Sequence, residues 1–179
     1  MTDDITPSHR PVVRLRPRIE ARPIRHGFPW VYADELVTDR RTQALAPGAI
    51  ATLDAHVVIS NVAAVDNTST TAGYGGALAH DSPDHDATVV NSIFWDNTPS
   101  EIEPKDNVTV RYSNIQGGFA GEGNLDTDPL FADNIFLHLK STTAYYDGGY
   151  FSGGEWLRAD QHSPLVDAGD PQSDWTGEP

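Results

Sequence analysis

The stretch that decides the fold is Val89-Val90-Asn91-Ser92-Ile93-Phe94-Trp95-Asp96-Asn97. An aliphatic residue opens it, Asn follows two positions later, an apolar residue comes three further on, and Asn closes it. An earlier copy begins at Ile59 and a weaker one at Val110, so the steps are 30 and 21 residues. A unit that repeats at this scale cannot bury its apolar side alone, which predicts a stacked array.

Superposing the copies aligns the side chains in columns. In stacked coils about 4.8 Å apart, we expect the apolar columns to be buried in parallel strands and the Asn amides to pair. The longer first step predicts a loop pointing outward within residues 72–86. The columns are Ile59, Val89 and Val110; Ala64, Phe94 and Ile115; and Asn61 and Asn91.

Composition and charge restrict the function classes. The chain has 179 residues, 38% hydrophobic and 21% charged, with 15 Gly and 13 Pro, which is typical of a turn-rich globular protein. It has no cysteine and no apolar run that could span a bilayer, and its first ten residues do not read as a secretory signal. Residues 1–55 carry a net charge of +1 and residues 56–179 carry −15, so nucleic acid could be bound only by the first segment.

The N-terminal segment contains a specific turn, His26-Gly27-Phe28-Pro29-Trp30-Val31-Tyr32. It follows an Arg-rich strand at residues 12–16 and precedes Pro47-Gly48. Residues 10–54 therefore resemble the N-terminal PUA-like domain of class I SAM-dependent methyltransferases that modify cytosine-5 of ribosomal RNA. The resemblance implies a small β-barrel that assists RNA binding, here truncated because the family's later strands do not follow.

The same resemblance names the residues that would contact RNA. The side chains with the right charge are Arg14, Arg16, Arg18, Arg22 and Arg25. No Gly-rich cofactor loop and no catalytic Cys follow, so we expect no methyltransferase activity. RNA contact by this PUA-like segment is the alternative function.

The rest of the chain resembles the final coils of right-handed parallel β-helix repeat proteins of the pectate-lyase-like superfold. The resemblance covers residues 56–179. It implies a mainly β fold in which a β-helix of about three coils follows the truncated PUA-like segment. The predicted divisions are residues 1–55, 56–140 for the coils, and 141–179 for a loop-rich closing segment. The motifs that carry the resemblance are residues 91–97, 112–118, 123–131 and 163–171.

Three sets of candidate site residues come from the second segment. The first is an aromatic set in a Gly-rich stretch, Tyr145, Tyr146, Tyr150, Phe151 and Trp156, which could form a contact surface for sugar rings. The second is an alternating oxygen set, Asn124, Asp126 and Asp128, which could hold Ca²⁺, although Asn and Asp beside Gly or Pro also form ordinary turns. The third is residues 80–86, with two His and three Asp, which is either a transition-metal site or a solvated turn.

The sequence favours a non-catalytic surface module that contacts glycan or matrix. We expect no cofactor, apart from the calcium alternative, and no membrane partner. A lyase or hydrolase remnant is the weaker enzymatic alternative, because no lyase motif surrounds the four Lys and Arg residues after residue 55. A third interpretation is a fusion or fragment with no selected function, because the two resemblances meet abruptly near residue 55. Relatives of β-helix type are extracellular and those of PUA type cytoplasmic, so location stays open.

Overall fold

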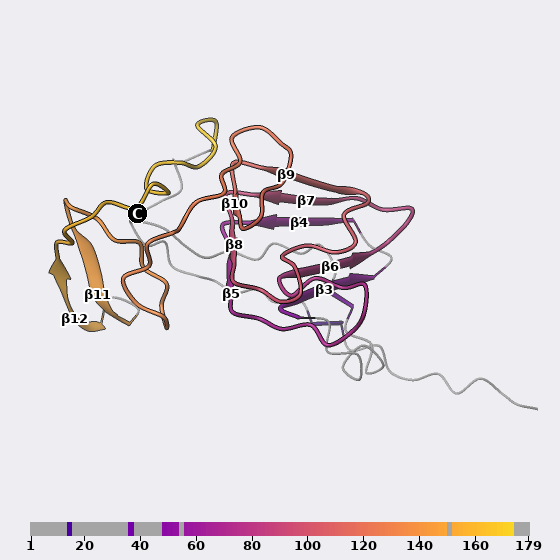
Figure 1. Ribbon diagram of the computed structural model, residues 1–179, viewed down its shortest axis with the longest axis horizontal. Helices are drawn as coiled ribbons and strands as arrows, with labels where there is room; N and C mark the ends of the chain where they lie inside the picture. The colour runs from indigo at the N-terminus through magenta and orange to yellow at the C-terminus, as the bar shows by residue number, and fades with distance from the viewer. Residues whose placement is uncertain (1–13, 16–35, 38–47, 54–55, 150–151, 174–179) are drawn as a thin grey trace, which may run out of the picture.

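The computed structural model describes residues 14–15, 36–37, 48–53, 56–149 and 152–173 (Figure 1). Within these ranges the chain forms strands and no helix, so the expected mainly β class is confirmed. Residues rich in β-branched side chains form the strands, and Asn, Asp and Gly separate them. The strands are β1 (Arg14–Leu15), β2 (Leu36–Val37), β3 (Ile50–Leu53), β4 (Val57–Ser60), β5 (Ala63–Val65), β6 (Leu78–Asp81), β7 (Ala87–Val90), β8 (Ile93–Trp95), β9 (Val108–Arg111), β10 (Asn114–Ile115), β11 (Tyr145–Gly149) and β12 (Ser152–Leu157).

The first sheet consists of β4, β7 and β9, which run parallel to one another (Figure 1). Ile59 lies opposite Val89, which in turn lies opposite Val110. Each of these side chains is at most 1% exposed, so the first apolar column is buried. The neighbouring position carries the exposed Val58 and Thr109, because successive side chains of a strand point to opposite faces.

The second sheet consists of β5, β8 and β10 and is also parallel. Ala64, Phe94 and Ile115 are aligned across it, and all three are buried. The prediction that the second column stacks and is buried is therefore confirmed, as it is for the first column. Burial of each large apolar side chain stabilises the fold by roughly 1.5–3 kcal/mol.

A third sheet was not expected from the sequence. β3 runs parallel to β6, and Leu78 of β6 also forms a parallel bridge with Ile102. The outward loop predicted within residues 72–86 is therefore wrong for its central part, because Leu78 and His80 are buried. The longer first repeat contains this additional strand. β3 belongs by number to the N-terminal segment, and the boundary at residues 55–56 stays a prediction.

All three parallel sheets contribute side chains to one hydrophobic core. The strands of each sheet lie above one another in the same order along the chain, so equivalent residues of successive repeats are neighbours in space. Each repeat contributes residues to this core. Its buried members are Val57, Ile59, Val62, Ala64, Ala77, Leu78, Val89, Phe94, Ile102, Val110 and Ile115.

The corners between sheets use left-handed backbone at repeated positions. Asn61, Asn91 and Tyr112 have φ of 55°, 51° and 47°, and they occupy the same place in the three copies. Asp66 and Asp96, at the next corner, have φ of 58° and 57°. Asn and Asp tolerate this conformation better than other non-glycine residues. Their repetition in the sequence is therefore explained by corner geometry.

Asparagine amides do pair, but at a different column from the one predicted. The Asn67 side-chain amide donates to Asn97 Oδ1 at 2.9 Å, and the Asn67 backbone N–H donates to the same oxygen. In the predicted column, the Asn91 side chain accepts from the backbone N–H of Asp170 and donates to Ser173 Oγ. The expectation that Asn61 and Asn91 pair is therefore wrong, because the Asn91 amide bonds to the C-terminal segment instead.

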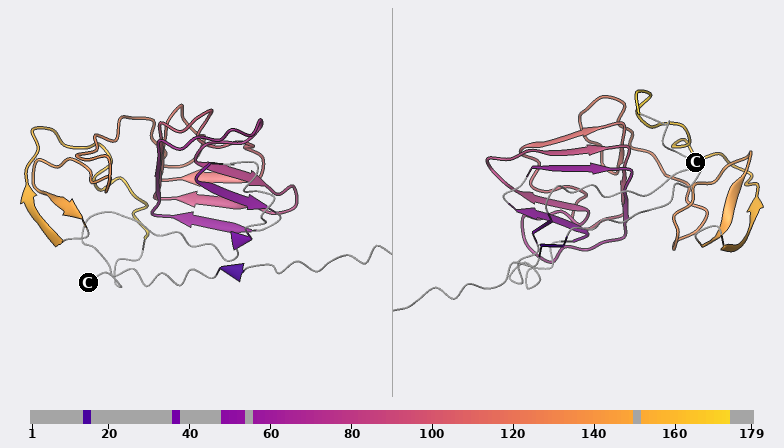
Figure 2. Two further views of the ribbon diagram at one scale, coloured as in Figure 1. Left: turned by 90° about the horizontal axis from the view of Figure 1, so that it is seen from below. Right: turned by 180° about the vertical axis from the view of Figure 1, so that it is seen from behind.

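After the stacked sheets the chain forms an antiparallel hairpin of β11 and β12 (Figure 1). The hairpin lies at the opposite end of the described molecule from β6 (Figures 1 and 2). The segment after it returns to the sheets, where Asp170 meets Asn91. β1 and β2 pair antiparallel to each other.

Candidate functional site

The hairpin has a tightly packed backbone that depends on glycine. Tyr146 on β11 lies opposite Trp156 on β12, and the register shifts between Asp147 and Gly149. A Cβ on Gly154 would lie 1.9 Å from the carbonyl oxygen of Asp147, so only glycine fits there. The Gly-rich composition of this stretch therefore brings the two strands together.

Four rings form a continuous row beside and across the hairpin, which we call the ring row: Phe136, His138, Tyr146 and Trp156. The ring centroids of Phe136 and His138 are 5.9 Å apart and the rings are stacked. His138 meets Tyr146 edge to face at 6.3 Å, and Tyr146 meets Trp156 edge to face at 5.5 Å. These are favourable arrangements for aromatic pairs.

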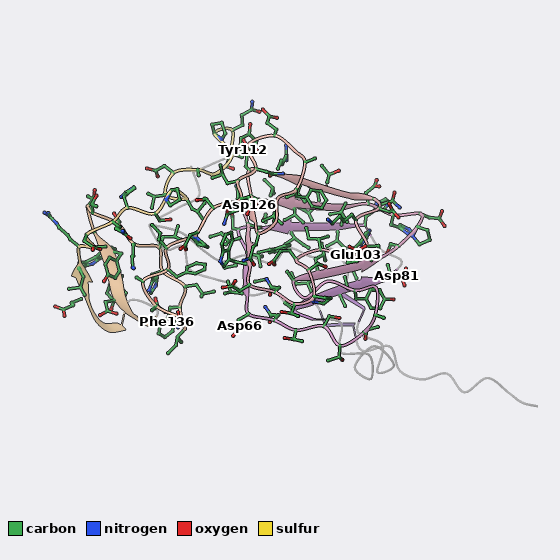
Figure 3. All side chains as sticks on the ribbon, viewed as in Figure 1. Asp66, Asp81, Glu103, Tyr112, Asp126 and Phe136 are labelled. Atoms are coloured by element: carbon green, nitrogen blue, oxygen red, sulfur yellow. The ribbon has the colours of Figure 1, made fainter. Side chains whose placement is uncertain are left out.

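The middle of the ring row is buried, and the rings at its two ends are partly exposed. Tyr146 is buried, and its hydroxyl oxygen accepts the backbone N–H of Gly154 at 3.0 Å. Trp156 is 54% exposed and Phe136 is 39% exposed, and Phe136 lies on the loop beside the hairpin (Figure 3). Ile135, next to Phe136, is also exposed. Large apolar side chains gathered at a surface mark sites that contact other molecules.

Asp133 holds the loop that carries Phe136 and His138. Its carboxylate accepts the backbone N–H groups of residues 135–138, and its Oδ2 lies 3.0 Å from Nδ1 of His138. Partial burial raises the pKa of Asp133, but the hydrogen bonds from backbone N–H groups and the electrostatic attraction of the His138 ring outweigh that effect. The pKa of Asp133 therefore lies below its ordinary value.

Asp133→Asn is expected to destabilise the protein by about 1–2 kcal/mol near neutral pH, because the amide loses one of the acceptor oxygens and the charge. A lowered carboxyl pKa contributes stability above the ordinary aspartate pKa, and this stability is lost as the pH falls through the lowered value. Urea unfolding of both proteins between neutral and acidic pH measures this difference. A difference that stays constant down to the most acidic conditions would contradict the role given to the Asp133 charge.

The structure separates the predicted aromatic residues. Tyr146 and Trp156 belong to the ring row, whereas Tyr145 lies at the neighbouring position of β11, where side chains point to the other face. Tyr150 and Phe151 lie outside the described residues. Phe136 and His138 were not predicted, although both alternate with Leu137 in a short apolar stretch, which could have suggested a common face.

The predicted calcium ligands are used to build turns. Asn124 Oδ1 accepts the backbone N–H of Ser113, and its amide donates to the carbonyl oxygens of Val110 and Phe119. It continues a column in which Ser113 Oγ accepts from Ser92 N–H and Ser92 Oγ accepts from Val62 N–H. Asn124 thus occupies the corner of the next layer.

The two carboxylates of that set also bond to backbone. Asp126 accepts from Gly117 N–H at 3.1 Å, and Asp128 accepts from Leu130 N–H at 2.9 Å. Asp126 lies on the loop beside β10 (Figure 3). Among the described residues, no three His, Cys, Asp or Glu side chains are grouped so that they could hold a metal ion. Calcium binding by Asn124, Asp126 and Asp128 stays a prediction.

The histidines of residues 80–86 have structural partners. His80 is buried on β6, where Nδ1 lies 2.6 Å from Thr52 Oγ1 and Nε2 lies 3.0 Å from the carbonyl oxygen of His85. Asp81 accepts the hydroxyl proton of Tyr74. These contacts favour the interpretation of this stretch as a strand and its turn.

The predicted RNA-binding arginines are outside what the structure places. Arg14 lies in β1, with no description of its side chain, and Arg16, Arg18, Arg22 and Arg25 lie outside the described residues. Their contact with RNA stays a prediction. In the described part of the chain, Arg111 lies 4.0 Å from Asp170, which ties β9 to the C-terminal segment.

Comparison with known proteins gives no match: no family model matches the chain, and neither does a curated protein or a solved structure. The resemblances to PUA-like domains and to β-helix repeats therefore stay hypotheses. Within the ranges that the structure describes, no helix is long and apolar enough to cross a membrane. The ring row is the candidate functional site that the geometry supports best.

Proposed function

We propose that this chain is a right-handed parallel β-helix module that binds neutral glycans, without catalysis, through the ring row. The fold part of the proposal is supported by the three parallel ladders, which repeat in the same order along the chain. Equivalent residues of successive repeats lie opposite one another, as stacked coils require. The stack presents the hairpin at one end of the molecule.

The observation that carries the functional part is the exposed Trp156 ring set edge to face against the buried Tyr146. A pyranose ring has an apolar face of C–H groups, and an exposed indole can cover that face. Tyr146 and the backbone hold Trp156 in a defined place, so binding costs little conformational entropy. Phe136 offers a second exposed ring at the other end of the same row.

The charge of the chain indicates which glycans fit. The net charge of −14 repels polyuronates and sulfated glycans, so the proposal names neutral polysaccharides. No reaction belongs to the proposal, because cleavage of a glycosidic bond needs two carboxyl groups placed on either side of that bond. A surface row of rings provides contact area only.

Trp156→Ala is expected to weaken binding to neutral oligosaccharides by about tenfold or more, because one aromatic anchor supplies much of the energy of such a contact. Isothermal titration with β-glucan, mannan and xylan oligosaccharides measures this. Phe136→Ala should cause a smaller loss, because Phe136 is less exposed than Trp156.

The matched control is Val58→Ser, which removes an exposed apolar side chain from β4, away from the ring row. Its binding should equal that of the wild type. Absence of binding to every neutral glycan, or equal binding by the Trp156→Ala variant, would contradict the proposal. Stronger binding of polyuronates than of neutral glycans would contradict the choice of ligand class.

A further inference from the structure

A cavity of about 320 Å³ lies where the third repeat turns away from the third sheet. Its lining includes Glu101 and Asn97 from the second repeat and Ile115 and Phe119 from the third. The third repeat proceeds from Gly118 to Asn124 in a few residues, so it adds no strand above Ile102. The cavity therefore follows from the shortened repeat.

Glu101 is a buried carboxyl group in this lining, with 5% of the residue exposed. Its two oxygens accept from one residue: Asn97 backbone N–H donates to Oε1 at 3.1 Å, and the Asn97 side-chain amide donates to Oε2. Among the described residues, Glu101 forms no ion pair. A buried charge normally has an opposite charge as its partner.

The surroundings of Glu101 disfavour the charged form of its carboxyl group. Burial raises its pKa above the ordinary value, the two bonds from Asn97 lower it, and the charge of Asp96 raises it further. Lys105 also lines the cavity but is exposed and does not pair with Glu101. A positively charged group inside the cavity would supply the missing partner.

We propose that this cavity binds a small primary organic amine, whose ammonium group pairs with Glu101 and whose apolar body contacts Ile115 and Phe119. The volume is at the lower end of the range for ligand sites, which is roughly 300–1,000 Å³. A compact body such as one six-membered ring suits that size. The net charge of −14 attracts cations to the protein.

The positive charge of Lys105 at the rim limits the class further. Lys105 would repel a second ammonium group on the ligand, so a monoamine fits better than a diamine. This inference does not depend on the glycan proposal, because the cavity and the ring row share no residue.

The test titrates the whole chain with cyclohexylamine and, separately, with cyclohexanol, which has the same ring without the charge. At about pH 7.5 the amine is protonated, and it should bind at least tenfold more tightly than the alcohol. Glu101→Gln should weaken amine binding about tenfold or more. Affinity should also fall with decreasing pH through the raised pKa of Glu101, because only the carboxylate pairs with the ammonium group.

Phe119→Ala should weaken the amine several-fold, whereas Trp156→Ala should leave amine binding unchanged. Should Glu101→Gln fail to fold, carbon-13 NMR of the Glu101 carboxyl in the wild type gives the answer instead: cyclohexylamine should lower its pKa. Equal affinity for the amine and the alcohol, unchanged binding after Glu101→Gln, or no amine binding at millimolar concentration overturns the inference. None of these outcomes bears on oligosaccharide binding at Trp156.

Discussion

Phe94→Ala is expected to lower the free energy of unfolding by about 3–5 kcal/mol. Phe94 is fully buried between Ala64 and Ile115 in the second sheet, so its removal leaves a cavity that neighbouring layers cannot fill. Ala64, which lies opposite Phe94 on the neighbouring strand, is too small to fill the space. Urea unfolding followed by circular dichroism measures the change.

The control for this substitution is Thr109→Ala, which shortens an exposed side chain on β9. Its effect should stay within about 0.5 kcal/mol, as is usual for surface substitutions. Equal stability of the Phe94→Ala protein and the Thr109→Ala protein would mean that Phe94 is not part of a packed core, which contradicts the stacked arrangement.

Asn97→Leu is expected to cost about 3 kcal/mol, although leucine has a similar size. The Asn97 amide donates to the carbonyl oxygen of Ala64 at 2.7 Å and to Glu101, and its Oδ1 accepts from Asn67. Each buried polar group that loses its partner costs about 1–3 kcal/mol. Thermal or urea unfolding gives the difference.

The matched control is Gln116→Ala, which removes an exposed amide that bonds to Asp96 on the surface. Its cost should be well below that of Asn97→Leu, because water replaces the lost bonds. The double variant Asn97→Leu with Glu101→Leu should recover part of the stability, since it removes a buried charge together with its donor. A cost for Asn97→Leu no larger than for Gln116→Ala would contradict the stabilising role given to the hydrogen bonds of Asn97.

The apolar columns could be predicted because their physical cause is local and periodic. Val89 and Phe94 recur at fixed positions in each copy, and burial of these positions in stacked strands follows from that spacing. The left-handed corners at Asp66 and Asp96 also have a local cause, because Asp tolerates this backbone conformation. In both cases the cause lies in the residue type and its spacing along the chain.

The third sheet could not be predicted from periodicity, because it does not repeat evenly. Leu78 lies in a strand of the longer repeat, but its partner Ile102 forms only a bridge in the shorter repeat. Unequal spacing alone therefore favours an outward loop. A run such as Leu78-Ala79-His80 has too few residues to distinguish a buried strand from a loop.

The ring row and the cavity could not be predicted, because each depends on contacts between distant parts of the sequence. Phe136 and His138 join Tyr146 and Trp156 only through the loop that Asp133 holds. Glu101 lines the cavity because Asn97 holds its carboxyl group there and because the short third repeat leaves that space open. Acidic residues are common in this chain, so sequence alone does not distinguish Glu101 from the others.

The measurement that tests the central claim most directly is a methyl and aromatic NOE experiment on the protein in solution. If repeats stack as parallel coils, strands about 4.8 Å apart bring equivalent side chains into contact. We predict NOEs from Ile59 to Val89, from Val89 to Val110, and from the Phe94 ring to Ile115. Absence of these three contacts, with Val89 and Phe94 instead contacting residues of an antiparallel neighbour, would contradict the proposed β-helix.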